Sequence, residues 1–99
     1  MKRAARFLGV WALSGLILAC GRSSYRPQTT DGGSIYREAC APCHEGNAGH
    51  GLRGLDLQPQ AVERRLRWGG RGMPAFPQIR GEARQNLVRY VTEMSRSRE

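Results

Sequence analysis

The sequence has no stretch of alternating apolar and polar residues long enough to form a β-strand, so we expect an all-helical domain. It also lacks an apolar run that would cross a bilayer comfortably, because its hydrophobic N-terminal stretch covers only residues 7–19. Acidic residues are scarce, with 8 Asp and Glu against 16 Lys and Arg. No basic helix or aromatic ladder accompanies this positive charge, which argues against a nucleic-acid partner.

The N-terminal residues have the pattern of an export signal. A short basic start, Met1–Arg6, precedes the apolar residues 7–19, as in a signal peptide. The end of the apolar run, Leu16–Cys20, resembles a bacterial lipobox, in which a cysteine preceded by a small residue is lipidated and becomes the new N-terminus. We therefore expect residues 1–19 to be a lipoprotein-type signal peptide and Cys20 to carry lipid. A soluble secreted form and an uncleaved membrane anchor remain alternatives, because hydropathy alone does not separate them.

The segment after Cys20 is predicted to connect this anchor to the domain. Residues 20–31 are polar, contain Pro27 and show no periodicity, so we expect a flexible tether. The folded domain is then expected to cover residues 32–97. A domain of this size buries too little apolar surface to be stable on its own, so we expect a bound group to complete its core.

The motif with the most specific chemistry is Cys40-Ala41-Pro42-Cys43-His44. Two cysteines three positions apart, followed at once by a histidine, are the attachment pattern of a covalently bound haem c. One turn of helix places both thiols on one side, where they add to the two vinyl groups of the haem. The next residue then points its imidazole at the iron. The motif therefore predicts thioether bonds at Cys40 and Cys43 and an iron ligand at His44.

A second ligand is predicted about thirty residues later, in Gly72-Met73-Pro74-Ala75-Phe76. Pro74 disfavours a helical conformation at Met73, which leaves the thioether free to point at a metal. A His/Met pair raises the reduction potential of a haem iron. We expect Phe76 and Ile79 to be walls of the haem pocket. A donor from Arg67 or Trp68 would reach a haem propionate, with ordinary packing and a solvated charge as the alternative.

Three helices are expected. Ser34 is a candidate N-cap for a short helix that runs toward Cys40. A second helix is expected at about Gln58–Trp68, with Pro59 at its first position. A third is expected at about Gly81–Ser95, where apolar residues recur at three- and four-residue steps and form one face. The residues of this apolar face are Ala83, Leu87, Tyr90, Val91 and Met94.

With these residues in place, the chain resembles a short, single-haem class I cytochrome c over essentially the whole domain. Besides the haem motif and the Met73 string, Gly32 and Tyr36 match the glycine and aromatic positions of the family's first helix. Residues Leu87–Val91 are similar to its closing helix. In the family the first and last helices cross at the glycine, so the resemblance implies a close helix contact at Gly32.

The resemblance implies a fold of about three helices wrapped around one haem. It implies His44 as the proximal ligand, Met73 as the distal ligand, and thioether bonds at Cys40 and Cys43. The implied function is electron transfer in the periplasm or at a membrane surface, with no bond chemistry by the chain itself. One departure is that residues 51–54 lack the family's proline, whose carbonyl accepts a hydrogen bond from the proximal imidazole.

The charge of the mature chain indicates the kind of partner. Removal of residues 1–19 deletes three basic side chains and no acidic ones, so the formal charge falls from +8 to about +5. The remaining basic side chains are all arginines. A basic surface of this kind would steer the protein toward a redox partner with an acidic docking surface, and a merely solvated surface is the alternative.

Three other functions are alternatives to electron transfer. A thiol-disulfide oxidoreductase would use Cys40 and Cys43, but it needs a depressed thiol pKa and normally a strand-helix scaffold. A zinc site would use Cys40, Cys43, His44 and His50, although structural zinc sites usually take their second ligand pair from a distant segment. A haem-based sensor or peroxidase-like protein would need an open iron face, which Met73 argues against.

Overall fold

The computed structural model describes residues 21–45 and 51–98. The predicted signal peptide and lipidated Cys20 lie outside these residues, as does His50. The described residues form helices joined by loops and contain no strand, which confirms the all-helical prediction. Two isolated backbone bridges, Arg22 with Ala75 and Gly70 with Met73, join loop segments. Within the described part of the chain, no helix has the length and apolar character needed to span a membrane.

The first helical segment is longer than the sequence predicts. It begins as α2 (Gly32–Ile35), continues as the π-helical turns η3 (Tyr36–Cys40) and ends as α3 (Ala41–His44). The N-cap is Asp31, whose carboxylate accepts a hydrogen bond from the backbone N–H of Ser34 at 2.8 Å. The prediction of Ser34 as the cap is therefore wrong, because Asp31 satisfies the free N–H groups of the first turn and Ser34 lies inside it.

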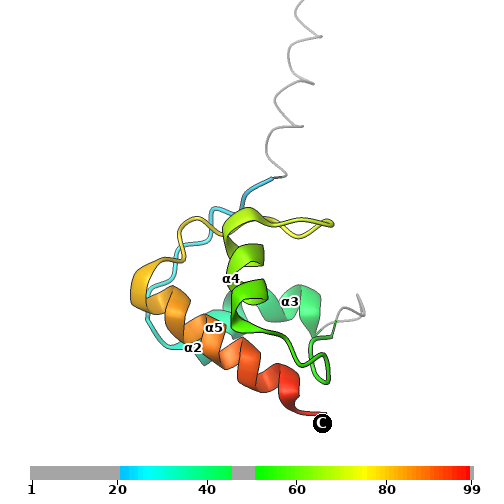
Figure 1. The fold of residues 1–99 in the computed structure, drawn as a ribbon. Helices are drawn as coiled ribbons and strands as arrows, with labels where there is room; N and C mark the ends of the chain where they lie inside the picture. Colours follow the sequence, from blue (N-terminus) through cyan, green and yellow to red (C-terminus); the bar gives the residue numbers. More distant parts are fainter. Residues whose placement is uncertain (1–20, 46–50, 99) are drawn as a thin grey trace, which may run out of the picture.

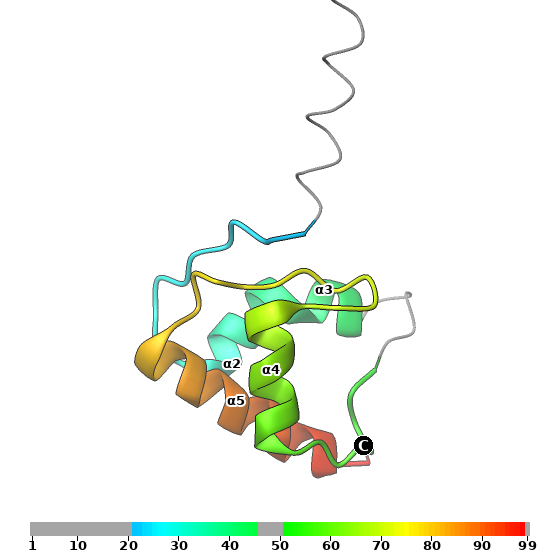
Figure 2. The same cartoon turned by 45° about the horizontal axis from the view of Figure 1, so that its top comes forward.

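The other two helices lie close to their predicted positions. Helix α4 covers Pro59–Trp68, with the proline at its first position, and ends at Gly69, whose φ of 68° is a conformation that favours glycine. Helix α5 covers Gly81–Arg96. The predicted apolar face of α5 is buried at Ala83, Leu87, Val91 and Met94. Figures 1 and 2 show α4 lying across α5, with α2 packed against α5 behind α4 and α3 at the end of the first helical segment.

The contact between α2 and α5 depends on the absence of a side chain at Gly32. A Cβ at this position would overlap the backbone carbonyl oxygen of Asn86, and it would lie 2.8 Å from the carbonyl carbon of Asn86 and 3.1 Å from Cβ of Tyr90. The crossing of the first and last helices at the glycine is thus confirmed. Beside it, the rings of Tyr36 and Tyr90 pack with their centroids 5.5 Å apart.

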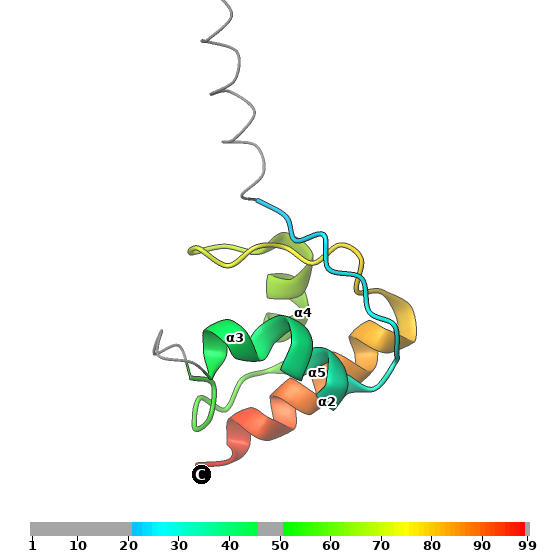
Figure 3. The same ribbon diagram turned by 180° about the vertical axis from the view of Figure 1, so that it is seen from behind.

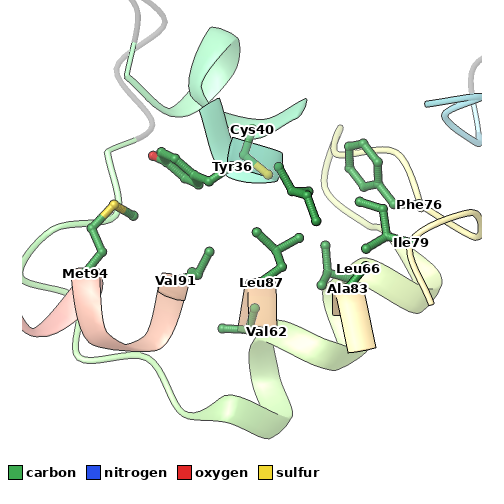
Figure 4. Close-up of a cluster of buried hydrophobic side chains, with 11 residues drawn as sticks. Tyr36, Cys40, Val62, Leu66, Phe76, Ile79, Ala83, Leu87, Val91 and Met94 are labelled. Atoms are coloured by element: carbon green, nitrogen blue, oxygen red, sulfur yellow. The ribbon is translucent and has the colours of Figure 1, made fainter. Parts of the chain in front are cut away.

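The core lies where the three helical segments meet, and Figure 4 shows its side chains converging from them. Tyr36 and Cys40 enter it from η3, Leu66 from α4, and Leu87 from α5. Phe76 and Ile79 join it from the segment between α4 and α5. The remaining members of the cluster are Ile35, Val62, Ala83, Val91 and Met94. Few elements contribute to this core, as expected for a short domain.

Residues 21–31, which the sequence predicts to be part of a flexible tether, run along the domain in the structure (Figure 3). The backbone N–H of Ser23 donates to the carbonyl of Ala75 at 2.8 Å, and the Asn86 side chain donates to the carbonyl of Thr30 at 2.7 Å. Tyr25 packs against the core. These contacts use backbone groups, one amide side chain and one aromatic ring, so they leave no periodic pattern in the sequence.

Replacement of Gly32 by alanine should destabilise the protein, because the added methyl group overlaps a backbone that cannot move without displacing α5. Overpacking of this kind costs about 1–3 kcal/mol or more. The Gly33→Ala variant is the matched control, since its Cβ would meet only side chains, the nearest atom being Cε1 of Tyr90 at 3.2 Å. Urea unfolding followed by circular dichroism measures both. Equal unfolding midpoints for the two variants would contradict the role assigned to Gly32.

Candidate cofactor site

A cavity of about 570 Å³ opens between the first helical segment, α4, α5 and the segment after α4. Its volume falls within the range of roughly 300–1,000 Å³ that cofactor and ligand sites occupy. Phe76 is one of its walls, as predicted, whereas Ile79 is not, because it is buried in the core beyond the cavity. Apolar side chains dominate the lining: Ala39, Leu52, Leu57, Ala61, Val62, Leu66, Pro74, Phe76, Leu87 and Val91.

The four site residues predicted from the sequence all line this one cavity. Cys40, Cys43 and His44 reach it from the end of the first helical segment, and Met73 reaches it from the segment after α4. Cys40 is buried and Cys43 is exposed, while His44 and Met73 are half-buried. Two segments about thirty residues apart in the chain are therefore brought to the same space by the packing of the first helical segment and of α4 against α5.

The two thiols differ in environment. Neither cysteine forms a disulfide. Burial, followed by the charge of Cys43, raises the pKa of the Cys40 thiol to about 11. A redox-active CxxC motif needs the opposite shift, since the attacking group is the thiolate. The environment of Cys40 thus disfavours a thiol-disulfide oxidoreductase.

Met73 is placed by a tight backbone turn. The N–H of Gly70 donates to the carbonyl of Met73 at 2.9 Å, and the N–H of Met73 donates back to Gly70 at 3.0 Å. The turn presses against Gly69, where a Cβ would lie 2.6 Å from the Met73 carbonyl oxygen. Beyond the turn, the N–H of Phe76 donates to the carbonyl of Leu66 at 2.7 Å and ties the segment to α4.

Two arginines, Arg65 and Arg71, line the cavity. Arg65 also donates from Nη1 to the carbonyl of Gly70 at 3.0 Å, so its guanidinium lies beside the Met73 turn. Arg67 and Trp68, which the sequence suggested as propionate donors, do not line this cavity. Nη2 of Arg67 lies 3.5 Å from Oε2 of Glu63, and the Trp68 residue is 75% exposed. Sequence reasoning missed Arg65 and Arg71, because nothing in the residue pattern around Gly69-Gly70 marks either as a cavity residue.

Sequence reasoning also missed the contacts that hold Glu45, the residue directly after His44. The Tyr36 hydroxyl donates to Oε2 of Glu45 at 2.9 Å, and Nη2 of Arg53 lies 3.5 Å from the same oxygen. Burial, the hydrogen bond and the charge of Glu45 raise the pKa of Tyr36, so its hydroxyl stays a donor. The carboxylate next to His44 is thus held both to the first helical segment and to the segment that begins at residue 51.

The zinc alternative falls partly outside the described residues, because it needs His50. Across residues 21–45 and 51–98, no three His, Cys, Asp or Glu side chains are grouped in a way that would hold a metal ion.

Comparison with known proteins gives two matches. Residues 27–91 match the family described as cytochrome C oxidase, cbb3-type, subunit III. The cytochrome c subunit of 4-cresol dehydrogenase [hydroxylating] from Pseudomonas putida is 30% identical over 90 residues, which cover 87% of this chain and 80% of the relative. No solved structure matches the chain significantly.

Proposed function

The chain belongs to the class I c-type cytochromes, in the family of the cbb3-type oxidase subunit III, and on this basis we propose that it carries single electrons on one covalently bound haem c. In this proposal Cys40 and Cys43 form the thioether bonds, His44 is the proximal iron ligand and Met73 is the distal one. The chain has a single CxxCH motif, which supports a single haem.

The observation that supports the proposal most directly is the shared cavity. Its walls hold both thiols, the imidazole and a methionine thioether, which are the groups needed to attach a haem and to ligate its iron on both faces. Its lining is otherwise mainly apolar, as the porphyrin ring requires. The residues present therefore fit a haem c.

When bound, the haem supplies the one-electron change between ferrous and ferric iron. The chain contributes the ligands and the surroundings. His44 and Met73 sit on a helix end and on a braced turn, so the same two ligands serve both oxidation states and structural reorganisation stays small. The apolar walls exclude water, and Arg65 and Arg71 supply positive charge for the acidic groups of the cofactor.

The electron partners are proposed to be proteins with acidic surfaces. Residues 63–84 hold six arginines and only two acidic residues, so positive charge is concentrated around the end of α4 and the Met73 turn. The exposed Trp68 lies in the same region, and exposed tryptophans and arginines are frequent anchors of protein interfaces. The P. putida relative is the cytochrome subunit of a dehydrogenase. By analogy, a dehydrogenase or oxidase subunit is the partner class we propose.

The protein is proposed to act outside the cytoplasm, in the periplasm, held to a membrane by lipid on Cys20. Cleavage before Cys20 would leave residues 20–31 between the lipid and the domain. Since residues 21–23 contact Ala75, such an anchor would hold the Met73 turn near the membrane rather than at the end of a loose tether. The basic start, the apolar run and the lipobox-like Leu16–Cys20 support this location.

Replacing Met73 by alanine should leave the haem attached but remove the sulfur-to-iron charge-transfer band of the oxidised protein. The midpoint potential should fall by on the order of 0.1 V or more, within the roughly 0.8 V range that axial ligands set. Absorption spectra and redox titration measure these changes. Met94→Ala is the control, because Met94 is buried in the core and its loss should lower stability while keeping the band. An unchanged band in Met73→Ala would rule out Met73 as the ligand.

Replacing both Cys40 and Cys43 by alanine should yield a chain without attached haem that lacks a cooperative thermal transition. Domains below roughly 70–80 residues rarely gain more than about 3–5 kcal/mol from an apolar core alone, and here the cavity would leave apolar walls facing water. Thermal melts followed by circular dichroism compare this variant with the holoprotein. A native-like melt of the haem-free chain would contradict the prediction that the haem completes the core.

The Cys20→Ala variant should abolish lipid attachment and change where the protein is found. The unaltered protein should sediment with membranes and have the mass of residues 20–99 plus haem and lipid, whereas Cys20→Ala should lack the lipid mass. Intact mass spectrometry of membrane and soluble fractions provides the measurement. A wild-type mass that retains residues 1–19 would instead indicate an uncleaved anchor, and a soluble wild-type without lipid would indicate a secreted form.

A further inference from the structure

Residues 21–25, here called the strap, pair with the segment that carries Met73. The N–H of Ala75 donates to the carbonyl of Gly21 at 3.2 Å, and the carbonyl of Ala75 accepts from the N–H of Ser23 at 2.8 Å. The pairing is parallel and centred on Arg22. In Figure 3 the strap and the segment after α4 run side by side. Both backbone groups of Ala75 are therefore satisfied by the strap.

The other end of the strap is fixed to the helix that carries the first haem cysteine. The Tyr25 hydroxyl donates to Oε1 of Glu38 at 2.7 Å, and Glu38 lies in η3, two residues before Cys40. The backbone N–H of Tyr25 donates to Oγ of Ser23 at 3.1 Å, which joins the two attachment points. Burial, the hydrogen bond to Glu38 and its charge raise the pKa of Tyr25 to about 12, so its hydroxyl remains a donor at neutral pH. The strap thus links the two sides of the cavity.

Without the strap, the Met73 segment would be held by its own turn and by α4. The turn closes between Gly70 and Met73, and the next bond to the rest of the domain is from Phe76 to Leu66. Ala75 lies between these points and is only 7% exposed. Buried backbone groups that lose their partners are costly, so release of the strap would favour movement of this segment. The match to the cytochrome family begins at residue 27, so the strap lies outside the part of the chain that the family describes.

We propose that Ser23 and Tyr25 are positioning residues for Met73: the strap they form keeps the Met73 thioether at the cofactor cavity and slows its departure from the iron. The inference rests on the proposed role of Met73 as distal ligand. It also gives residues 21–25 a function in the electron-transfer site, in place of the flexible connection that their composition predicts.

The experiment uses the full-length oxidised holoprotein and free imidazole as an exogenous iron ligand. At saturating imidazole, the rate of ligand exchange equals the rate at which Met73 leaves, and stopped-flow absorbance at the sulfur-to-iron band measures it. Ser23→Pro removes the backbone N–H that donates to the carbonyl of Ala75. Tyr25→Phe removes the hydroxyl that donates to the carboxylate of Glu38. Each should increase the limiting rate by about fivefold, the factor that corresponds to the net value of one hydrogen bond.

Two control variants separate positioning from general loss of stability. Ser24→Ala changes an exposed residue of the strap that bonds neither Ala75 nor Glu38, and Asn86→Ala breaks the bond to Thr30 without touching Ala75. Both should exchange within about twofold of the wild-type rate, the usual range for surface substitutions. Amide hydrogen exchange gives a second readout: the Ala75 N–H should lose protection in Ser23→Pro but keep it in Ser24→Ala. Should Ser23→Pro fail to fold, Tyr25→Phe carries the test.

The outcomes distinguish this inference from the proposed function. A wild-type protein with the sulfur-to-iron band, whose limiting rate is the same in Ser23→Pro, Tyr25→Phe and both controls, would overturn the strap while leaving Met73 as ligand. A wild-type protein without the band would overturn the ligand role of Met73 and the strap inference with it. Faster exchange confined to Ser23→Pro and Tyr25→Phe would support the strap.

Discussion

The close crossing of α2 and α5 at Gly32 is the constraint on which the rest of the structure depends. At this crossing the backbone of the first helical segment packs directly against the backbone of α5, so a single methyl group on Gly32 would overlap the Asn86 carbonyl. Because the haem motif lies at the end of this segment, the crossing also fixes the direction in which Cys40 and His44 face. Leu87 and Val91 of α5 then form one wall of the cavity, so the helix contact and the cofactor site both depend on α5.

The opposite side of the cavity has no such helix contact and is built from loops. The Met73 turn is closed by Gly70, tied to α4 through Phe76 and Leu66, and paired with residues 21–23 through Ala75. Each of these is a backbone hydrogen bond of modest net value, about 1 kcal/mol or less, so the segment depends on several of them together. In the proposed site, Met73 would depend on these loop bonds to stay at the iron, which gives the strap its importance.

The sequence predicted the features that follow from local chemistry. The CxxCH spacing, the Pro59 start of α4 and the apolar face of α5 each depend on residues within a few positions of one another. The N-cap at Asp31 was missed because both Asp31 and Ser34 are good capping residues. Only the backbone conformation selects between them, since Asp31 is extended and the helix begins at the next residue. The strap and the Arg65 contact were missed for a different reason. They join residues far apart in the chain or use backbone groups, and neither leaves a pattern in side-chain composition.

The central claim is that one iron is held in the cavity between His44 and Met73 by a haem fixed at Cys40 and Cys43. The most direct test is a single sample of the protein matured in a periplasm, analysed by intact mass and by absorption spectra in both redox states. The account predicts the mass of the polypeptide plus one covalent haem and a low-spin spectrum with the sulfur-to-iron band in the oxidised state. A colourless protein with the mass of bare polypeptide would contradict it.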